Sequence, residues 1–445
     1  MKRHSAMLLS GLCALVGLAT LGPVTSAAER PTGKAPARAR ENFYLKDGDR
    51  VVFYGDSITD QRLYTTYIES FCVSRFPKKH FTFIHSGWGG DRVTGGGGGP
   101  IDMRLTRDVL AYKPTVVTIC LGMNDGSYSA FDQGRFDTYV NGFRHILDTL
   151  LKELPGVRIT LLTAPAYDDV TRDLLFPGGY NSTLIAYGEA VKSLGKEYGL
   201  TVADTNAPLV GALARAKTAN ADLAAVIIKD RVHPGSGGHV VMAAAVLKAW
   251  NAPDTVGDIE IDGKTGKVGR HVNSHVSDVN LAGGKLSFKH QEDALPWPID
   301  RDPKNNPDTG LVLASTDIEQ TLNRYMLKVT GLSGANYALK VDGTPIGTVS
   351  GDDLAKGVDL AALSGDPANR QASDVLNAVR KHTNLHNHRW RDVQVQMQKG
   401  QDGLHVSDNI KRQMDDLDAQ ETVALKELQD KLAPMPHTVE ISPSP

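Results

Sequence analysis

Ser57 is the first residue in this sequence whose setting suggests chemistry. It lies in the segment Gly-Asp-Ser-Ile-Thr-Asp, residues 55–60, directly after a short apolar run and at the expected start of a helix. A serine between a parallel strand and a helix N-terminus is exposed at the crevice of the sheet, where the helix dipole favours developing negative charge. Taken alone, such a serine is more often a plain helix N-cap, so a second signal is needed.

The second signal is a loop near residue 230 that carries an aspartate and a histidine. Asp230 and His233 lie three residues apart, just before the predicted helix 236–250. A nucleophilic serine needs a neutral imidazole to take its proton, and the imidazole needs a carboxylate on its other nitrogen. One turn can present both groups. Together with Gly-Asp-Ser, this loop predicts a catalytic triad of Ser57, His233 and Asp230.

Two further segments supply candidates for an oxyanion hole. They are Ser-Gly-Trp-Gly-Gly-Asp at 86–91 and Gly-Met-Asn-Asp at 122–125. A tetrahedral intermediate needs donors aimed at its oxygen. The predicted donors are the backbone N–H groups of Ser57 and Gly90 and the amide of Asn124, with Gly87 competing with Gly90. The residues predicted to contact substrate are Asp56 and Trp88.

Alternating strand and helix patterns between residues 50 and 251 must position these segments. Strands are predicted over 50–54, 80–85, 115–121, 157–162 and 200–203, and helices over 61–76, 136–154, 181–198 and 236–250. Strands joined by helical crossovers predict a parallel sheet with helices on both faces. Each candidate segment then follows a strand or precedes a helix at one edge of that sheet.

In this order, the four segments resemble the SGNH, or GDSL, hydrolase family of esterases. The resemblance covers residues 50–250, under half of the chain, and Ile58 stands where many members have leucine. It implies a flavodoxin-like three-layer α/β/α sandwich with strand order 2-1-3-4-5. It also implies Ser57 as nucleophile, His233 as base, Asp230 as acid, and Gly90 and Asn124 as oxyanion donors, with no cofactor and no metal.

The pattern changes beyond residue 251, where short alternating runs punctuated by glycine and aspartate predict a β-sandwich-like unit. The predicted organisation is a signal peptide at 1–28, a flexible lead-in at 29–41, the hydrolase domain at 42–252, a β-rich accessory unit at 253–368 and a helical tail at 369–445. No nucleophile–base pair lies beyond 251, so the later regions are expected to contribute stability or substrate placement. A chain ending after 253 is expected, if it folds, to hydrolyse small esters.

The N-terminus predicts export. A basic start at residues 2–4 precedes an apolar run over 6–21 and small residues at 25–28, a pattern typical of a cleaved secretory signal. The predicted location is therefore secreted or periplasmic, with no membrane span after cleavage. An uncleaved membrane anchor remains the alternative, because such segments look similar.

Composition and the remaining motifs exclude several classes of protein. Lys and Arg total 49 against 51 Asp and Glu, so no basic excess exists to bind a nucleic acid. The glycine run 95–99 lacks the strand–helix setting of a dinucleotide site and the lysine of a P-loop. Cys72 and Cys120 are interpreted as buried free thiols, with one disulfide as the alternative. The histidines interpreted as structural, solvated or packed rather than metal-binding are His239, His382, His386 and His388.

These observations predict a secreted serine ester hydrolase, with carbohydrate acetyl esters as the first substrate class. An accessory β-unit suits an extended polymer, and the polar segments 87–100 and 166–181 favour a short acyl group. The expected partner is a polysaccharide or small-molecule ester. A lipid or thioester hydrolase is the alternative enzyme. A non-catalytic cell-surface binding protein is the alternative of another class.

Overall fold

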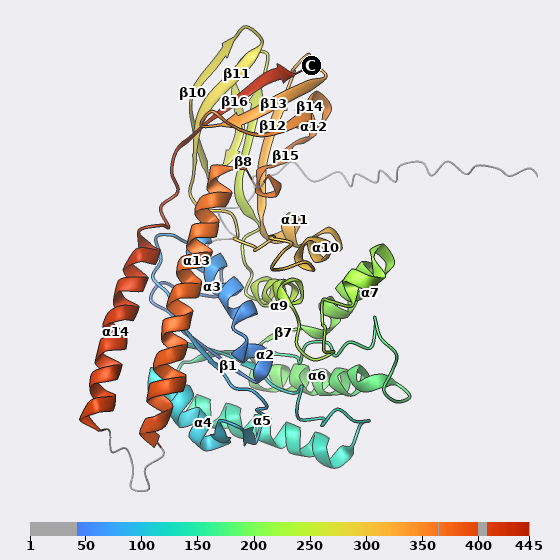
Figure 1. The fold of residues 1–445 in the computed structure, drawn as a ribbon, viewed down its shortest axis with the longest axis vertical. Helices are drawn as coiled ribbons and strands as arrows, with labels where there is room; N and C mark the ends of the chain where they lie inside the picture. The colour runs from blue at the N-terminus through green and yellow to red at the C-terminus, as the bar shows by residue number, and fades with distance from the viewer. Residues whose placement is uncertain (1–41, 364, 399–406, 445) are drawn as a thin grey trace, which may run out of the picture.

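A parallel sheet forms the centre of the catalytic half (Figure 1). In the computed structural model of the chain, residues 42–363, 365–398 and 407–444 are described. The sheet has the order β2-β1-β5-β6-β7, and each neighbouring pair is parallel. This is the predicted order 2-1-3-4-5, so the flavodoxin-like fold is confirmed. The strands are β1 (Arg50–Gly55), β2 (Thr82–Gly87), β5 (Val116–Cys120), β6 (Arg158–Leu162) and β7 (Thr201–Ala203).

Helices cover both faces of this sheet, which confirms the three-layer prediction. One apolar core joins it to α3 (Leu63–Arg75), α7 (Asn206–Ala219) and α9 (Ser236–Ala249). The other joins it to α4 (Ile101–Asp108), α5 (Gln133–Glu153) and α6 (Gly179–Tyr198). The short elements are α2 (Ser57–Asp60), β3 (Gly95–Gly96), β4 (Gly99–Pro100), η1 (Leu110–Tyr112) and α8 (Ala221–Ala224).

The sequence patterns explain which of these helices could be predicted. In α5, Asp132 accepts a hydrogen bond from the Arg135 N–H as N-cap, and an apolar stripe at helical spacing faces the sheet. Helices α4 and α7 were not predicted. Half of the residues in α4 are charged, and three of them, Arg104, Arg107 and Asp108, are buried in ion pairs. Helix α7 carries a proline and a glycine that weaken the helical signal.

The accessory unit is built from two packed sheets, as the alternating runs predicted. One sheet has the order β15-β12-β8-β9 and the other β10-β11-β16-β13-β14, and their inner faces share one apolar core. The elements of residues 255–362 are β8 (Thr255–Asp262), β9 (Val268–Val272), β10 (Ser274–Ala282), β11 (Lys285–Glu292), α10 (Thr309–Ala314), α11 (Ile318–Leu322), β12 (Arg324–Thr330), β13 (Asn336–Val341), β14 (Thr344–Ser350), α12 (Gly351–Lys356), β15 (Val358–Asp359) and η2 (Leu360–Ala362).

The predicted helical tail is helical for most of its described length but ends in a strand. Its elements are α13 (Pro367–His388), η3 (Arg389–Val393), η4 (Gln394–Gln398), α14 (Asp408–Gln429) and β16 (His437–Ser444). Strand β16 pairs with β11 and β13 in the middle of the accessory sheet. The predicted helical tail is thus confirmed in α13 and α14, and its last residues form a strand because Val439 and Ile441 alternate into the accessory core.

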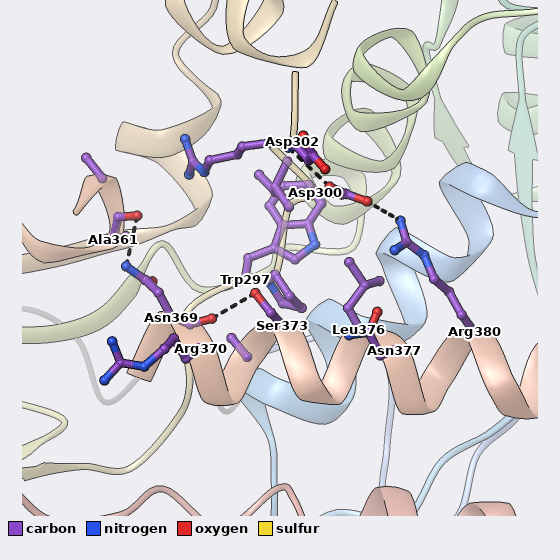
Figure 2. A pocket seen from close by; sticks show the side chains of 15 residues that line it. Trp297, Asp300, Asp302, Ala361, Asn369, Arg370, Ser373, Leu376, Asn377 and Arg380 are labelled. Carbon is purple, nitrogen blue, oxygen red and sulfur yellow. Dashed lines mark hydrogen bonds and ion pairs between the residues drawn. The ribbon is translucent and has the colours of Figure 1, made fainter. Parts of the chain in front are cut away.

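Helix α13 with its continuation η3 forms a hairpin with α14, called here the tail hairpin, that runs along the hydrolase domain from the accessory unit to the level of α4 (Figure 1). Figure 2 shows how α13 is held beside a cavity of about 330 Å³. There, Arg380 pairs with Asp300 of the accessory unit at 2.9 Å. The tail hairpin therefore bridges the two halves of the molecule.

Two further predictions concern cysteines and membrane spans. Cys72 and Cys120 are free and buried, as predicted. In the described part of the chain, no helix has the length and apolar character to cross a bilayer. The predicted signal peptide and lead-in, residues 1–41, lie outside the described residues.

Candidate active site

Ser57 is the first residue of α2, directly after β1. Asp56 precedes it as the N-cap, because its Oδ1 accepts a hydrogen bond from the Ile58 N–H at 3.0 Å. Ser57 is partly exposed, whereas Asp56 is only 1% exposed. Asp56, predicted to contact substrate, thus occupies a buried position from which it supports the turn that carries Ser57.

The loop after residue 229 brings His233 onto Ser57. His233 Nε2 lies 2.8 Å from Ser57 Oγ, and His233 Nδ1 lies 2.6 Å from Asp230 Oδ2. The other Asp230 oxygen accepts hydrogen bonds from the backbone N–H groups of Val232 and His233, which closes the loop into a turn. The residues predicted as a triad are thus joined in one hydrogen-bonded chain, from oxygen to imidazole to carboxylate.

The electrostatics of this pair are set by hydrogen bonds more than by burial. Partial burial acts to raise the pKa of Asp230, but the hydrogen bonds from the His233 backbone and ring outweigh it and hold that pKa below its usual value. The Asp230 side chain is 57% exposed and the His233 side chain 34% exposed. Asp230 therefore stays ionised at neutral pH, in contact with solvent.

The predicted oxyanion donors lie in the loops that follow β2 and β5. Asn124 Nδ2 donates to the Asp91 carbonyl at 3.0 Å, and its Oδ1 accepts from the Tyr128 hydroxyl at 2.7 Å. These two bonds fix the amide and leave one N–H of Nδ2 for a ligand. Tyr128, four residues after Asn124, was not predicted, although its spacing in the segment Asn-Asp-Gly-Ser-Tyr is a local signal.

The backbone geometry distinguishes Gly87 from Gly90 as the candidate oxyanion donor. Gly87 ends β2 against α2, where a β-carbon would lie 2.2 Å from the Asp60 nitrogen, so only glycine fits. Gly90 lies in the next turn with φ +77°, and its α-carbon faces open space. A backbone N–H in that turn is free of the strand ladder. Gly90 is therefore better placed than Gly87 to face a ligand.

Two carboxyl groups, Asp56 and Asp125, are buried in the segments that carry Ser57 and Asn124. Burial raises the pKa of Asp56 to about 8, although its hydrogen bond from Ile58 works against the shift. Burial likewise raises the pKa of Asp125 to about 6, opposed by the hydrogen bond from the Val93 N–H. In both residues Oδ2 is buried without a hydrogen-bond partner among the described residues. Asp56 is therefore protonated at neutral pH.

A chain of buried polar contacts connects the oxyanion segment to the tail hairpin. Asp91 Oδ2 accepts from Arg104 Nε at 2.5 Å, and a second nitrogen of Arg104 pairs with Asp108. Asp108 Oδ1 in turn accepts from the indole N–H of Trp390 at 2.6 Å. The Asp91 carbonyl accepts from Asn124, so Trp390, in η3 directly after α13, lies three side chains from the predicted oxyanion donor. Long-range contacts of this kind leave no trace in local spacing, and Trp390 was not predicted.

Trp88, predicted to contact substrate, lies against the tail hairpin as well. The guanidinium of Arg391 lies 3.6 Å from the centroid of the Trp88 ring, and the Trp390 ring meets it edge-on at 5.6 Å. Trp88 is partly exposed. The wall of the site next to Gly89 and Gly90 is therefore shared by the hydrolase domain and the tail.

The accessory unit also reaches the histidine loop, through the start of α9. Asp308 Oδ2 accepts from the Gly237 N–H at 2.8 Å, in the first turn of the helix that follows His233. Trp297 donates its indole N–H to the Tyr67 carbonyl, and the Tyr67 hydroxyl contacts Ser236 Oγ at 2.6 Å. These contacts from beyond residue 253 fix the helix on which the loop depends.

The glycine run at 95–99 is a packed hairpin rather than a nucleotide loop. Strands β3 and β4 pair across it, and a β-carbon at Gly98 would lie 2.5 Å from the Arg104 side chain. Only glycine lets this segment approach Arg104 and Trp88. The run thus supports the buried chain behind the oxyanion segment.

The histidines set aside in the sequence are packed or solvated, as predicted. His239 is buried, accepts from the Tyr64 N–H, and its pKa is lowered by burial to about 3. His382 and His386 are buried near Glu421, while His388 is exposed and contacts Asp392. Within the described residues, no group of histidine, cysteine and acidic side chains is arranged to hold a metal ion.

Comparison with known proteins identifies a family and two relatives that this chain resembles. The model of the GDSL-like lipase/acylhydrolase family matches residues 53–241, which include all the predicted catalytic and oxyanion residues. An acetylxylan esterase of Geobacillus stearothermophilus is 26% identical over 222 residues, which cover 46% of this chain and 94% of the relative. A gut microbial diltiazem-metabolizing enzyme matches with a TM-score of 0.77 and 26% identity, covering 90% of this chain and 98% of its own.

Proposed function

We propose that this chain, whose residues 53–241 match the GDSL-like lipase/acylhydrolase family of ester hydrolases, is a secreted serine acetylesterase acting on acetylated carbohydrates. The observation that carries the proposal is the hydrogen-bonded chain from Ser57 through His233 to Asp230, with distances of 2.8 and 2.6 Å. That arrangement has the geometry needed to activate a serine hydroxyl.

In the proposed mechanism, Ser57 Oγ attacks the ester carbonyl while His233 Nε2 takes its proton. Negative charge develops on the former carbonyl oxygen, where the Asn124 amide and the Gly90 and Ser57 N–H groups donate hydrogen bonds. Collapse of this intermediate breaks the bond to the sugar oxygen, which receives the proton from His233. Water activated by His233 then releases acetate and restores Ser57.

The acetyl and carbohydrate parts of the proposal rest on likeness and on the rim of the site. The Geobacillus relative is an acetylxylan esterase, and the neighbour that covers 90% of this chain is a diltiazem-metabolizing enzyme, which acts on a small molecule. The segment from Gly87 to Pro100 near Ser57 is mostly glycine and polar residues. A long acyl chain would need an extended apolar trough. Export is proposed from the N-terminal pattern.

One observation favours a second candidate, a hydrolase of longer acyl esters. Leu174 and Leu175 are 51% and 55% exposed, on a loop whose Asp173 carbonyl accepts a hydrogen bond from Arg231 of the histidine loop. Exposed leucines near a catalytic loop can cover an acyl chain. Values of kcat/KM for p-nitrophenyl acetate, butyrate, octanoate and palmitate decide between the two. A series that falls from acetate supports the proposal, and one that rises toward octanoate supports the alternative.

The serine chemistry is tested by fluorophosphonate labelling of the full-length wild type and of Ser57→Ala. Ser193→Ala is the matched control, because Ser193 is exposed on α6. Labelling and acetate release are expected for the wild type and the control and are expected to vanish in Ser57→Ala. An unlabelled, inactive wild type would support a binding protein instead. Wild-type activity in Ser57→Ala would rule out the triad.

A further inference from the structure

Two arginines beside Ser57, one of them from the tail hairpin, form a second recognition feature. We propose that Arg391 and Arg62 make a carboxylate-binding subsite, so that the preferred substrates are acetate esters that also carry a carboxylate, such as acetylated acidic sugars. This inference rests on the esterase function proposed above and names its substrate class. Three sets of contacts support it.

Arg391 is held in place without using its hydrogen-bonding capacity. Its guanidinium stacks on Trp88 at 3.6 Å and lies 5.3 Å from the Trp390 ring centroid. No hydrogen bond joins its side chain to another residue of the described chain, and its Nη1 is shielded from solvent with no partner. An arginine offers five donors in a rigid plane, so Arg391 is oriented and still unsatisfied.

The location of Arg391 relative to Ser57 is given by Asp60 and Gly89. Arg391 Nη2 lies 3.8 Å from Asp60 Oδ2, which is too long for a hydrogen bond. A β-carbon built on Gly89 would lie 3.9 Å from Asp60 Oδ2 and 4.0 Å from Ser57 Cβ. Gly89 thus lies between Ser57 and the Asp60 carboxylate, which Arg391 faces. A sugar ring bound at Ser57 can reach the guanidinium across that glycine.

Arg62 brings a second positive charge to the same place. It follows α2 with a left-handed backbone, φ 57°, and lines a cavity of about 230 Å³ between the start of α3 and α13. Arg62 follows Asp60 by two residues, directly after α2. Burial lowers the pKa of Arg62, Asp60 counteracts this, and the charge of Arg391 lowers it further. The side chain of Arg62 has no hydrogen-bond partner among the described residues.

The charge balance favours a carboxylate over a more highly charged ligand. Arg391 faces the Asp60 carboxylate, and Arg62 follows Asp60 by two residues, so these three groups carry one positive charge in excess. Bringing like charges together is unfavourable unless an anion joins them. A planar carboxylate matches the guanidinium fork and carries the single negative charge that is needed, whereas a phosphate monoester carries nearly two.

The test compares kcat/KM for paired esters that differ only in charge. The pairs are 3- and 4-acetoxybenzoate with the corresponding neutral acetoxybenzamides. The preference for the carboxylate member is expected to fall about tenfold in Arg391→Gln and in Arg62→Gln, as expected for a lost charge-assisted hydrogen bond. Arg389→Gln is the matched control, because Arg389 lies two residues away and pairs with Asp418. The change is expected mainly in KM, and Arg391→Lys is expected to retain part of the preference.

Each outcome decides between distinct conclusions. Equal losses for both members of a pair in Arg391→Gln would overturn the subsite, since they would mean that Arg391 only supports Trp88. A wild type that hydrolyses both members without preference also overturns it and leaves the esterase intact. If no ester is hydrolysed and Ser57 is unlabelled, the esterase itself fails. Should Arg391→Gln not fold, Arg391→Lys and Arg62→Gln decide the question.

Discussion

The exposure of Asp230 predicts that the three residues of the predicted triad contribute unequally to kcat. Its Oδ2 contacts His233 Nδ1 at 2.6 Å, yet its side chain is 57% exposed. Two charges about 4 Å apart interact by about 1 kcal/mol in water and about 4 kcal/mol in a medium of intermediate polarity. A carboxylate that is about half exposed lies between these two limits, so its contribution to the imidazolium of the transition state is about 1.5–2.5 kcal/mol. Asp230→Ala is therefore expected to lower kcat about 10- to 100-fold.

Replacement by asparagine is expected to be worse than replacement by alanine. Asp230 Oδ1 is already held by the N–H groups of Val232 and His233, so an amide at this position would turn its NH₂ toward His233 Nδ1. That donor would favour the tautomer with the proton on Nε2, which cannot accept the Ser57 proton. Asp230→Asn is therefore expected to lose about 10³-fold in kcat, and His233→Ala about 10⁴-fold or more.

Single-turnover rates with p-nitrophenyl acetate measure this order directly, because they isolate acylation from product release. Circular dichroism and thermal unfolding serve as controls for the fold of each variant. A loss in Asp230→Ala as large as that in His233→Ala would refute the argument from exposure. An asparagine variant more active than the alanine variant would refute the argument from the tautomer.

The remaining predictions concern the surroundings of the site. Trp390→Phe removes the hydrogen bond to Asp108 and is expected to lower stability by about 1.5–3 kcal/mol and kcat several-fold; an unchanged kcat would contradict the coupling to Asn124. Asp56 keeps its proton in the fold up to about pH 8 but loses it in the unfolded chain near pH 4, so its ionisation makes the wild type less stable as pH rises between these values. The melting temperature of Asp56→Asn, relative to that of the wild type, should therefore rise from pH 5 to pH 8. A difference in melting temperature that does not change with pH would contradict this. Truncation after Pro253 removes Asp308, Trp297 and Trp390, so the product should aggregate or hydrolyse p-nitrophenyl acetate poorly, contrary to the expectation from sequence; a well-folded, fully active truncation would restore that expectation.

The residues that sequence could identify are those whose chemistry is written into short segments. Ser57 follows Asp56 at a strand–helix junction, and His233 lies three residues after Asp230, so residue type and spacing suffice to propose their roles. The sheet could be predicted for a similar reason, because buried parallel strands are continuous apolar runs. These features depend on local sequence, and the structure brings them together at the carboxyl edge of β1.

The residues that sequence could not identify act through contacts between distant segments. Arg104 and Asp108 look like surface charges of a polar helix, yet both are buried because they pair with one another and with Asp91 and Trp390. A buried charge is favourable only when its partners are present, and those partners come from other segments. Strand β16 escaped prediction for a related reason, since its pairing partners lie about 100 and 150 residues earlier in the chain.

The regions after residue 253 make three separate contacts with the catalytic apparatus, and each reaches a different part of it. Asp308 binds the first turn of the helix behind His233, Trp390 binds the ion-pair chain behind Asn124, and Arg391 covers Trp88 next to Ser57. None of these residues supplies a nucleophile or a base, so the bond-breaking groups all remain within residues 57–233. The three contacts come from the accessory unit and the tail hairpin, and they meet at one site. The two regions therefore hold that site in place and form part of its rim. We therefore expect the hydrolase domain to determine the reaction and the added regions to determine which ester fits beside Ser57.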